Sequence, residues 1–255
     1  AETLIDDIAM LNAALKIVDQ NPLGSAAGYG SSFPIDRTFT TKELGFETLK
    51  YNSVAAQMSR GKSEKTVAFA MSSVAATLAK FSMDVCLYMS QNFDFITLPS
   101  HLTTGSSIMP HKKNPDVFEL IRGKCNKIQA LPYEITLITN NLPSGYHRDL
   151  QLLKEGLFPA IQNLKACLDI ALFSIKDIKV KEHILDDKKY DYLFTVDSLN
   201  EMVVAGMPFR DAYKAVAEQL ENGTFQSPKE TKHTHEGSIN NLCLDAIKEK
   251  MRASF

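Results

Sequence analysis

The sequence has 255 residues, of which 44% are hydrophobic and 23% charged, and its formal net charge is −2. This composition is ordinary for a globular chain of one or two domains. The near-neutral charge gives no reason to expect a nucleic acid or an anionic membrane as partner. We expect no apolar run to be long enough to span a bilayer, and no signal peptide is visible.

Apolar residues recur three or four positions apart along four long stretches, which is the pattern of helices. The stretches are 3–18, 65–89, 117–138 and 151–175. At 1.5 Å per residue, the three longest would each measure about 33 to 38 Å. Their opposite faces are also largely apolar, which is typical of helices buried on several sides. We therefore expect a bundle whose helices also pack on other subunits, the alternative being a larger monomeric bundle.

A second region begins near residue 185 and contains shorter helical patterns. They cover 196–204, 209–220 and 239–251. Gly206 ends the first of them and Pro208 opens the second. Neither an internal repeat nor a convincing strand alternation is visible. The sequence predicts an all-α protein with a helical bundle over 1–184 and a small helical domain over 185–255.

The four cysteines are far apart in sequence, and none forms a Cys-x-x-Cys pair. They are Cys86, Cys125, Cys167 and Cys243. Three of them lie among apolar residues in helical patterns. We therefore expect buried, reduced thiols in a cytosolic protein.

A polar loop before the third long helix carries most of the reactive side chains of the chain. It holds Gly105, Ser106, Ser107, Lys112 and Lys113. Asn114, followed by Pro115 and Asp116, predicts a helix start with Asn114 as its cap. Paired serines after glycine commonly mark only flexibility, and paired lysines a solvated surface. Together, before a helix N-terminus that favours anions, they also suit a carboxylate site under a mobile lid.

The run from Gly105 to Asn114, Gly-Ser-Ser-Ile-Met-Pro-His-Lys-Lys-Asn, resembles a family signature. The signature is Gly-Ser-x-x-Met-x-x-Lys-x-Asn of the fumarase/aspartase superfamily, and all its fixed positions are matched. Members of this superfamily eliminate across a Cα–Cβ bond and release fumarate. Within it, the segments 21–37, 143–154 and 205–212 resemble the argininosuccinate lyases.

The resemblance assigns roles to four residues in and after this loop. Ser106 matches the general base that removes the Cβ proton, and Lys112 matches the lysine that stabilises the resulting carbanion. Asn114 matches a carboxylate-binding residue. Glu119 matches the acid that pairs with a catalytic histidine from another subunit; a solvated helix acid is the alternative from the sequence alone.

A second segment, residues 143–154, supplies further substrate contacts by the same resemblance. Tyr146, Gln151 and Lys154 match substrate-binding residues. Gln151 and Lys154 are three positions apart, so we expect them on one face of the following helix. Without the resemblance, Tyr146 reads as a capping aromatic and Lys154 as a surface charge. A substrate with three carboxylates and a guanidinium needs such cations and directional hydrogen-bonding groups.

Two blocks of the superfamily pattern are missing from this chain. They are a Ser-x-Asn-Asp segment and a Thr-His segment, which supplies the catalytic histidine. Both would lie before Ala1, so we expect the chain to be the C-terminal portion of the enzyme and to be inactive alone. The segment 59–66 also departs from relatives, because the acid of their Ser-Glu-Arg-Asp-like run is absent here.

Lys232-His233-Thr234-His235-Glu236 has the spacing of a metal site, because His-x-His with a nearby acid can bind zinc. The reaction class implied by the resemblance needs no metal. Packing of an ordinary loop is therefore our interpretation of this segment, and we expect no cofactor and no metal.

The resemblance implies a lyase that cleaves argininosuccinate to arginine and fumarate, the last step of arginine biosynthesis. We expect a cytoplasmic homotetramer with sites shared between subunits, a small-molecule substrate, and neither nucleic acid nor membrane as partner. Two alternatives stay open. One is another fumarate-releasing lyase, such as an adenylosuccinate lyase, and the other is a helical scaffold that has lost catalysis.

Overall fold

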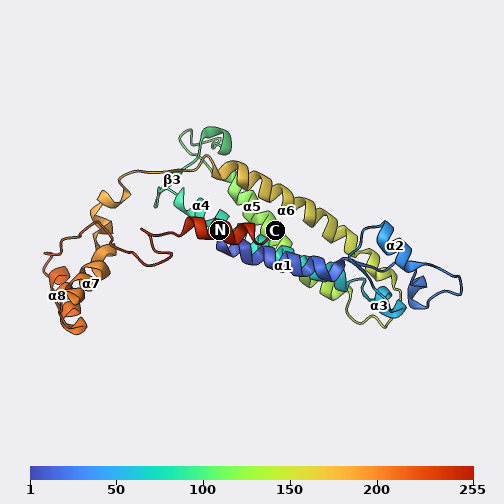
Figure 1. The fold of residues 1–255 in the computed structure, drawn as a ribbon. Coiled ribbons are helices and arrows are strands. Elements are labelled where there is room, and N and C mark those ends of the chain that lie inside the picture. Colours follow the sequence, from blue (N-terminus) through green and yellow to red (C-terminus); the bar gives the residue numbers. More distant parts are fainter. The chain divides into compact units, whose positions relative to one another are not determined.

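The computed structural model describes residues 1–255 and contains two compact units. The first comprises residues 1–179 and the terminal residues 251–255, and the second comprises residues 180–250 (Figure 1). The predicted all-α class is confirmed, since the strands are only two residues long. The sequence did not anticipate that residues 251–255 belong to the first unit, where Asn12 donates a 2.9 Å hydrogen bond to the carbonyl of Ser254.

Four long helices build the first unit. They are α1 (Glu2–Val18), α4 (Lys62–Tyr88), α5 (Asp116–Ile138) and α6 (Leu153–Ile175). They match the four apolar stretches of the sequence to within three residues at their ends. Helix α5 packs between α4 and α6, and α1 packs on α4. The helices therefore lie side by side along their length (Figure 1).

The core of this unit is the seam where α4, α5 and α6 meet. Phe118 and Ile121 of α5 and Leu153 of α6 are almost fully buried. Phe81 of α4 meets Phe118 edge to face, with ring centroids 5.9 Å apart. Because each such apolar side chain stabilises the fold by about 1.5–3 kcal/mol when buried, this seam holds the bundle together.

Short elements connect α1 to α4. They are β1 (Gln20–Asn21), η1 (Ala26–Gly28), α2 (Arg37–Glu43), β2 (Thr48–Leu49) and α3 (Ser53–Met58), with β1 parallel to β2. Asn21 is fully buried and its amide donates to the hydroxyl of Thr41 at 2.9 Å. The guanidinium of Arg37 donates to the carbonyls of Leu23, Lys50 and Tyr51. Asn21 and Arg37 thus fix the path of the chain here.

The remaining elements of this region flank α5 and α6. They are β3 (Ile96–Thr97), η2 (Ser100–Leu102), η3 (Arg148–Gln151) and β4 (Lys179–Val180). Gln151 lies in η3, a 3₁₀ turn, while α6 begins at Leu153. Leu152, which joins the two, has helical backbone angles of φ −64° and ψ −23°, so a shared face for Gln151 and Lys154 stays a prediction.

The second unit is a helix pair with an irregular C-terminal half. Its elements are η4 (Ile184–Asp186), η5 (Lys188–Phe194), α7 (Thr195–Val204), α8 (Phe209–Glu221) and most of α9 (Leu244–Arg252), whose last two residues belong to the first unit. Its core is small and centres on Leu199, Ala212 and Val216. The predicted helix 239–251 begins later, at Leu244. Cys243 has a positive φ of 53°, a conformation that an α-helix does not tolerate, so the helix starts after it.

Two helical segments, Lys62–Tyr88 and Arg148–Ile175, are long and apolar enough to cross a membrane by length and composition alone. The expectation that no such run exists is thus wrong on that measure. In these segments 44% and 28% of the most apolar window is buried inside the protein. The core helices of a bundle pass the same test, so this is weak evidence for a membrane.

Candidate functional site

The signature loop, residues 103–114, is closed at its base by backbone hydrogen bonds. The amide of Thr104 donates to the carbonyl of Asn114 at 3.1 Å, and the amide of Asn114 donates back at 2.8 Å. The side-chain amide of Asn114 donates to the carbonyl of Gly105 at 3.4 Å. The prediction that Asn114 caps the helix is wrong: α5 begins at Asp116 with Pro115 in the cap position, because Asn114 is held by the loop.

Ser106 accepts two hydrogen bonds within this loop. Its Oγ receives the backbone amides of Ile108 at 3.2 Å and Met109 at 3.1 Å. Two amide donors directed at one oxygen stabilise negative charge on it, as an oxyanion hole does. The loop therefore holds Ser106 Oγ in place with two backbone donors directed at it.

Lys112 and Glu119 are exposed, and neither side chain forms an ion pair within this chain. Lys112 is placed by its backbone amide, which donates to the carbonyl of Met109 at 3.1 Å. Glu119 lies in the first turn of α5. Both charges are consequently available to groups outside this chain.

A half-buried thiol, that of Cys86, lies close to Glu119. Burial raises the pKa of Cys86, while the charge of Arg122 lowers it and that of Glu119 raises it. The guanidinium of Arg122 is in turn 3.0 Å from the sulfur of Met83. Glu119 therefore sits in a charged surface between α4 and the start of α5.

The second segment, residues 143–154, is docked against the start of α4. Arg60 donates to the carbonyl of Leu150 at 2.8 Å, and the amide of Gly145 lies 3.3 Å from the sulfur of Met58. The side-chain amide of Gln151 donates to the hydroxyl of Tyr146 at 2.9 Å. The structure thus brings Tyr146 and Gln151 together, and Lys154 is exposed in the first turn of α6.

The two groups of candidate residues lie at opposite ends of the bundle. The signature loop precedes α5 and the second segment follows it (Figure 1). Helix α5 has 23 residues, which at 1.5 Å per residue is about 34 Å. No substrate the size of an amino-acid derivative bridges that distance. One chain therefore does not bring Ser106 and Lys112 to Tyr146 and Gln151.

Two residues that position the site were not predicted from the sequence. Thr104 acts only through its backbone, so its side chain gives no signal. Arg60 precedes Gly61, whose amide donates to the carboxylate of Glu64 at 2.6 Å in a capping box for α4. Gly61 and Glu64 have the spacing of a capping box, which marks the start of a helix. That pattern would have predicted Arg60 at the end of the bundle, beside the second segment.

The segment considered as a metal site has other partners. His233 Nε2 is 2.7 Å from Asp197 Oδ1 on α7, and the ring of His235 stacks on that of His233 at 6.3 Å. No cluster of three potential ligands forms in the chain. All four cysteines are free thiols.

Comparison with known proteins connects this geometry to a family. A family model described as "Lyase" matches residues 1–130, which is half of the chain. The argininosuccinate lyase of Parabacteroides distasonis is 60% identical over 99% of this chain. That of Bacteroides fragilis is 58% identical over all of this chain. The chain spans only 57% of the length of each of these relatives.

The fold is shared with solved structures of lower sequence identity. An EDDS lyase crystallised with formate superposes with a TM-score of 0.72 at 21% identity, over 87% of this chain and 45% of that one. That likeness shows the helical-bundle fold, and the family match covers the first four helices together with the signature loop. The chain belongs to the lyase family.

Proposed function

We propose that this chain carries the base-catalysed half of an argininosuccinate-cleaving active site. The observation that carries the proposal is the pair of amide hydrogen bonds to Ser106 Oγ, at 3.2 and 3.1 Å. A serine is a useful base only when its anion is stabilised, and this loop supplies the donors. The identity to argininosuccinate lyases over nearly the whole chain supports the choice of substrate.

In the proposed reaction the Ser106 alkoxide removes the Cβ proton of argininosuccinate. The electron pair left on Cβ is delocalised into the adjacent carboxylate, and Lys112 stabilises this dianionic group while Asn114 binds a carboxylate. The pair then forms the Cα–Cβ double bond of fumarate as the Cα–N bond breaks. The departing guanidino nitrogen takes a proton from a histidine that lies outside this chain and pairs with Glu119. The products are arginine and fumarate.

We further propose that the complete site is shared between copies of the chain in a homotetramer. The distance of about 34 Å along α5 requires a second copy to bring Tyr146, Gln151 and Lys154 to the signature loop. An antiparallel copy does this, because it places the end of α5 of one subunit beside the beginning of α5 of the next.

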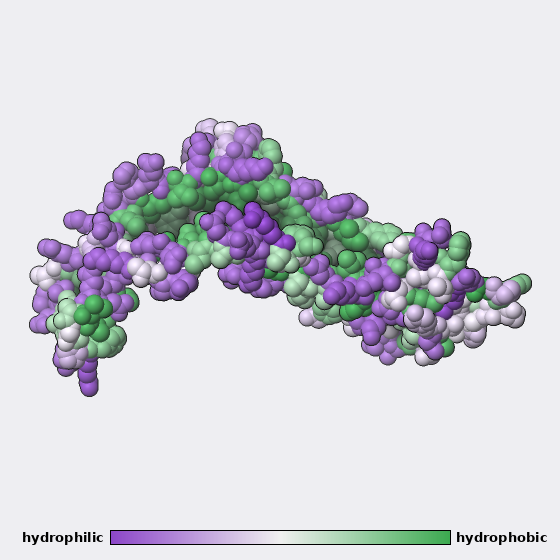
Figure 2. All heavy atoms as spheres, viewed as in Figure 1, coloured by the Kyte–Doolittle hydropathy of each residue, from purple (hydrophilic) through white to green (hydrophobic).

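A groove between α5 and α6 has the charges that such an antiparallel arrangement needs. Lys124 and Lys127 lie toward its α5 N-terminal end, and Glu134 and Glu155 toward the other. Reversing one copy sets the lysines of one subunit against the glutamates of the next. Large apolar side chains are exposed on α5 and α6, and Figure 2 shows apolar residues along the helices of the first unit. They include Leu120, Tyr133, Leu137, Phe158 and Leu172.

The two alternatives make different predictions for the same protein. An adenylosuccinate-lyase-like enzyme would keep Ser106 and Lys112 but cleave a purine-bearing substrate. A scaffold would have no need of the loop chemistry, and the intact signature argues against it. We place the enzyme in the cytoplasm, as a biosynthetic lyase without cofactor or metal.

The test uses a chimera, because this chain spans only part of its relatives. The part of the Parabacteroides distasonis relative that this chain does not match is joined to this chain, and fumarate release is followed by its ultraviolet absorbance. We expect turnover of argininosuccinate and none of adenylosuccinate or malate. Turnover of adenylosuccinate instead would favour the first alternative. A folded tetrameric chimera that turns over none of the three would favour the scaffold.

A further inference from the structure

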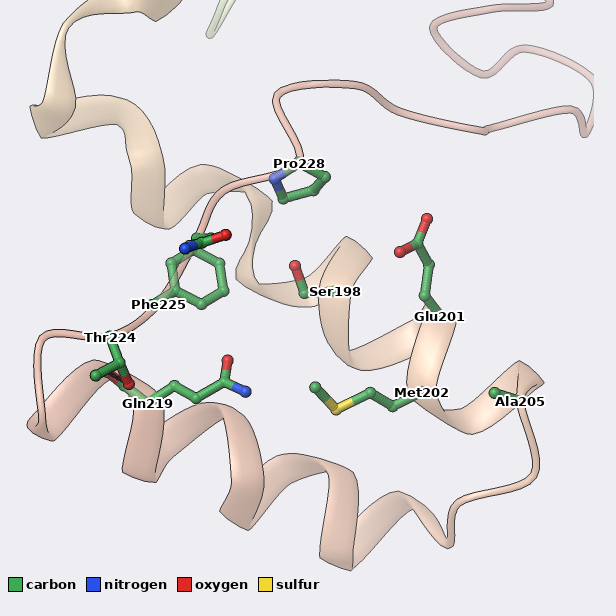
Figure 3. A pocket seen from close by; sticks show the side chains of 9 residues that line it. Ser198, Glu201, Met202, Ala205, Gln219, Thr224, Phe225 and Pro228 are labelled. Atoms are coloured by element: carbon green, nitrogen blue, oxygen red, sulfur yellow. Dashed lines mark hydrogen bonds between the residues drawn. The ribbon is translucent and has the colours of Figure 1, made fainter.

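The second unit contains a pocket of about 650 Å³ between its two helices and the segment that follows α8. Ser198, Glu201 and Met202 line it from α7, at a spacing that places them on one face of that helix. Gln219 of α8 and Phe225 line it from the other side, and Figure 3 shows Gln219 and Met202 pointing toward each other across the space. The volume lies within the range of small-molecule sites.

Hydrogen bonds hold the wall of this pocket in place. The amides of Thr224 and Phe225 both donate to the carbonyl of Gln219, at 2.9 and 3.2 Å. The ring of Phe225 meets that of Tyr192 edge to face at 6.4 Å. Further along, Lys229 Nζ donates to the carbonyl of Leu185 at 3.0 Å. The wall is thus fixed at both ends before any ligand arrives.

Glu201 is the only charged side chain that lines the pocket, and it lies at the rim (Figure 3). Its Oε1 is 2.9 Å from Nζ of Lys232, whose side chain is 78% exposed. An exposed pair of this kind contributes little free energy, because the ammonium exchanges readily with water. A ligand cation can therefore replace Lys232 on Glu201.

We propose that this pocket binds a small organic cation, an ammonium or guanidinium group on a short apolar chain. The cationic head pairs with Glu201, and the hydroxyl of Ser198 accepts a further N–H. The apolar chain lies between Met202 and the ring of Phe225, where it is removed from water. This site belongs to the second unit alone, so it does not depend on the proposed lyase activity.

The experiment is a titration of the 255-residue chain with four probes whose alkyl chains have three or four carbons. Butylguanidinium and butylammonium are the cationic probes, and butanol and butyrate are the neutral and anionic controls. Binding is measured by NMR, from the shift of the Met202 methyl signal. We expect saturable binding of both cations, and an affinity about two- to fivefold weaker for butanol and butyrate.

Three variants separate the proposed contact from a general charge effect. Glu201→Gln should weaken cation binding by about two- to fivefold, the worth of an exposed ion pair, while Lys232→Gln should strengthen it because the competing ammonium is gone. Glu218→Gln, an exposed acid of α8 outside the pocket, should leave the affinity unchanged. The proposal is overturned if neither cation saturates at millimolar concentration, if butyrate binds equally well, or if Glu201→Gln has no effect.

Discussion

Gly61 lies directly against the side-chain methyl of Thr139, at the end of the bundle where α4 begins and α5 has just ended. A Cβ atom on Gly61 would collide with Cγ2 of Thr139. Gly61 also has a positive φ of 82°, which favours glycine over other residues. The same few residues hold the second segment, since Arg60 binds the carbonyl of Leu150.

Gly61→Ala should therefore destabilise the chain, by about 2–4 kcal/mol, through both the backbone conformation and the collision. Urea unfolding measures the change. Adding Thr139→Ser removes the methyl group and should recover part of the loss but not the backbone contribution. The matched control is Gly123→Ala in α5, where a Cβ meets nothing within 4 Å and a gain of about 0.5–1 kcal/mol is expected. Equal effects at both glycines would contradict the packing described.

The side chain of Asp7 in α1 is buried, and the hydroxyl of Ser73 is its hydrogen-bond donor. It is 3% exposed, its Oδ1 accepts from Ser73 of α4 at 2.5 Å, and its Oδ2 has no hydrogen-bond partner. Ser73→Ala leaves the whole carboxylate without a donor and should cost about 2–3 kcal/mol. Ser72→Ala, one position away, should change the free energy of unfolding by less than about 0.5 kcal/mol. If the two variants unfold at the same urea concentration, the Asp7 contact does not stabilise the α1–α4 pair.

The thiol of Cys125 should stay unreactive in the folded chain. Burial, and secondarily the neighbouring Cys167, raises the pKa of Cys125 from 9.0 to about 12. Iodoacetamide at pH 8 should therefore label Cys243 first and Cys125 only after unfolding, as peptide mass mapping would show. Fast labelling of Cys125 in the native chain would show that the α5–α6 seam opens.

The same raised pKa gives a pH dependence of stability with a definite sign. Between pH 9.0 and about 12 the unfolded thiol loses a proton that the folded thiol keeps. The free energy of unfolding should therefore fall as pH rises through this window, by at most about 1.4 kcal/mol per pH unit from this group. Cys125→Ala should lose that component when the two unfolding curves are compared at each pH.

The long helices were predictable because their apolar residues repeat over more than twenty positions, as in α4 and α5. The first residue of α5 was not predicted correctly. The backbone hydrogen bonds between Thr104 and Asn114 hold Asn114 in the loop, so its preference for the cap position is not realised. The position of Cys243 shows the same limit: its left-handed backbone delays α9, and no local pattern announces it.

The candidate site was only partly predictable, for a physical reason. The signature fixes which residues share a loop, and a hydrogen-bonded loop does hold Ser106, Lys112 and Asn114. The signature alone does not predict how far that loop lies from Tyr146 and Gln151. That distance follows from the length of α5. The two amide donors to Ser106 depend on the loop conformation and were likewise visible only in the structure.

We propose Ser106 as the base, with the amides of Ile108 and Met109 directed at its Oγ. The most direct measurement compares Ser106→Ala with Ser107→Ala in the chimera, following fumarate release from argininosuccinate. We expect Ser106→Ala to lower kcat about a hundredfold to ten-thousandfold with little change in the tetramer, and Ser107→Ala to retain most of the activity. Equal kcat values for Ser106→Ala and the unsubstituted chimera would contradict the assignment.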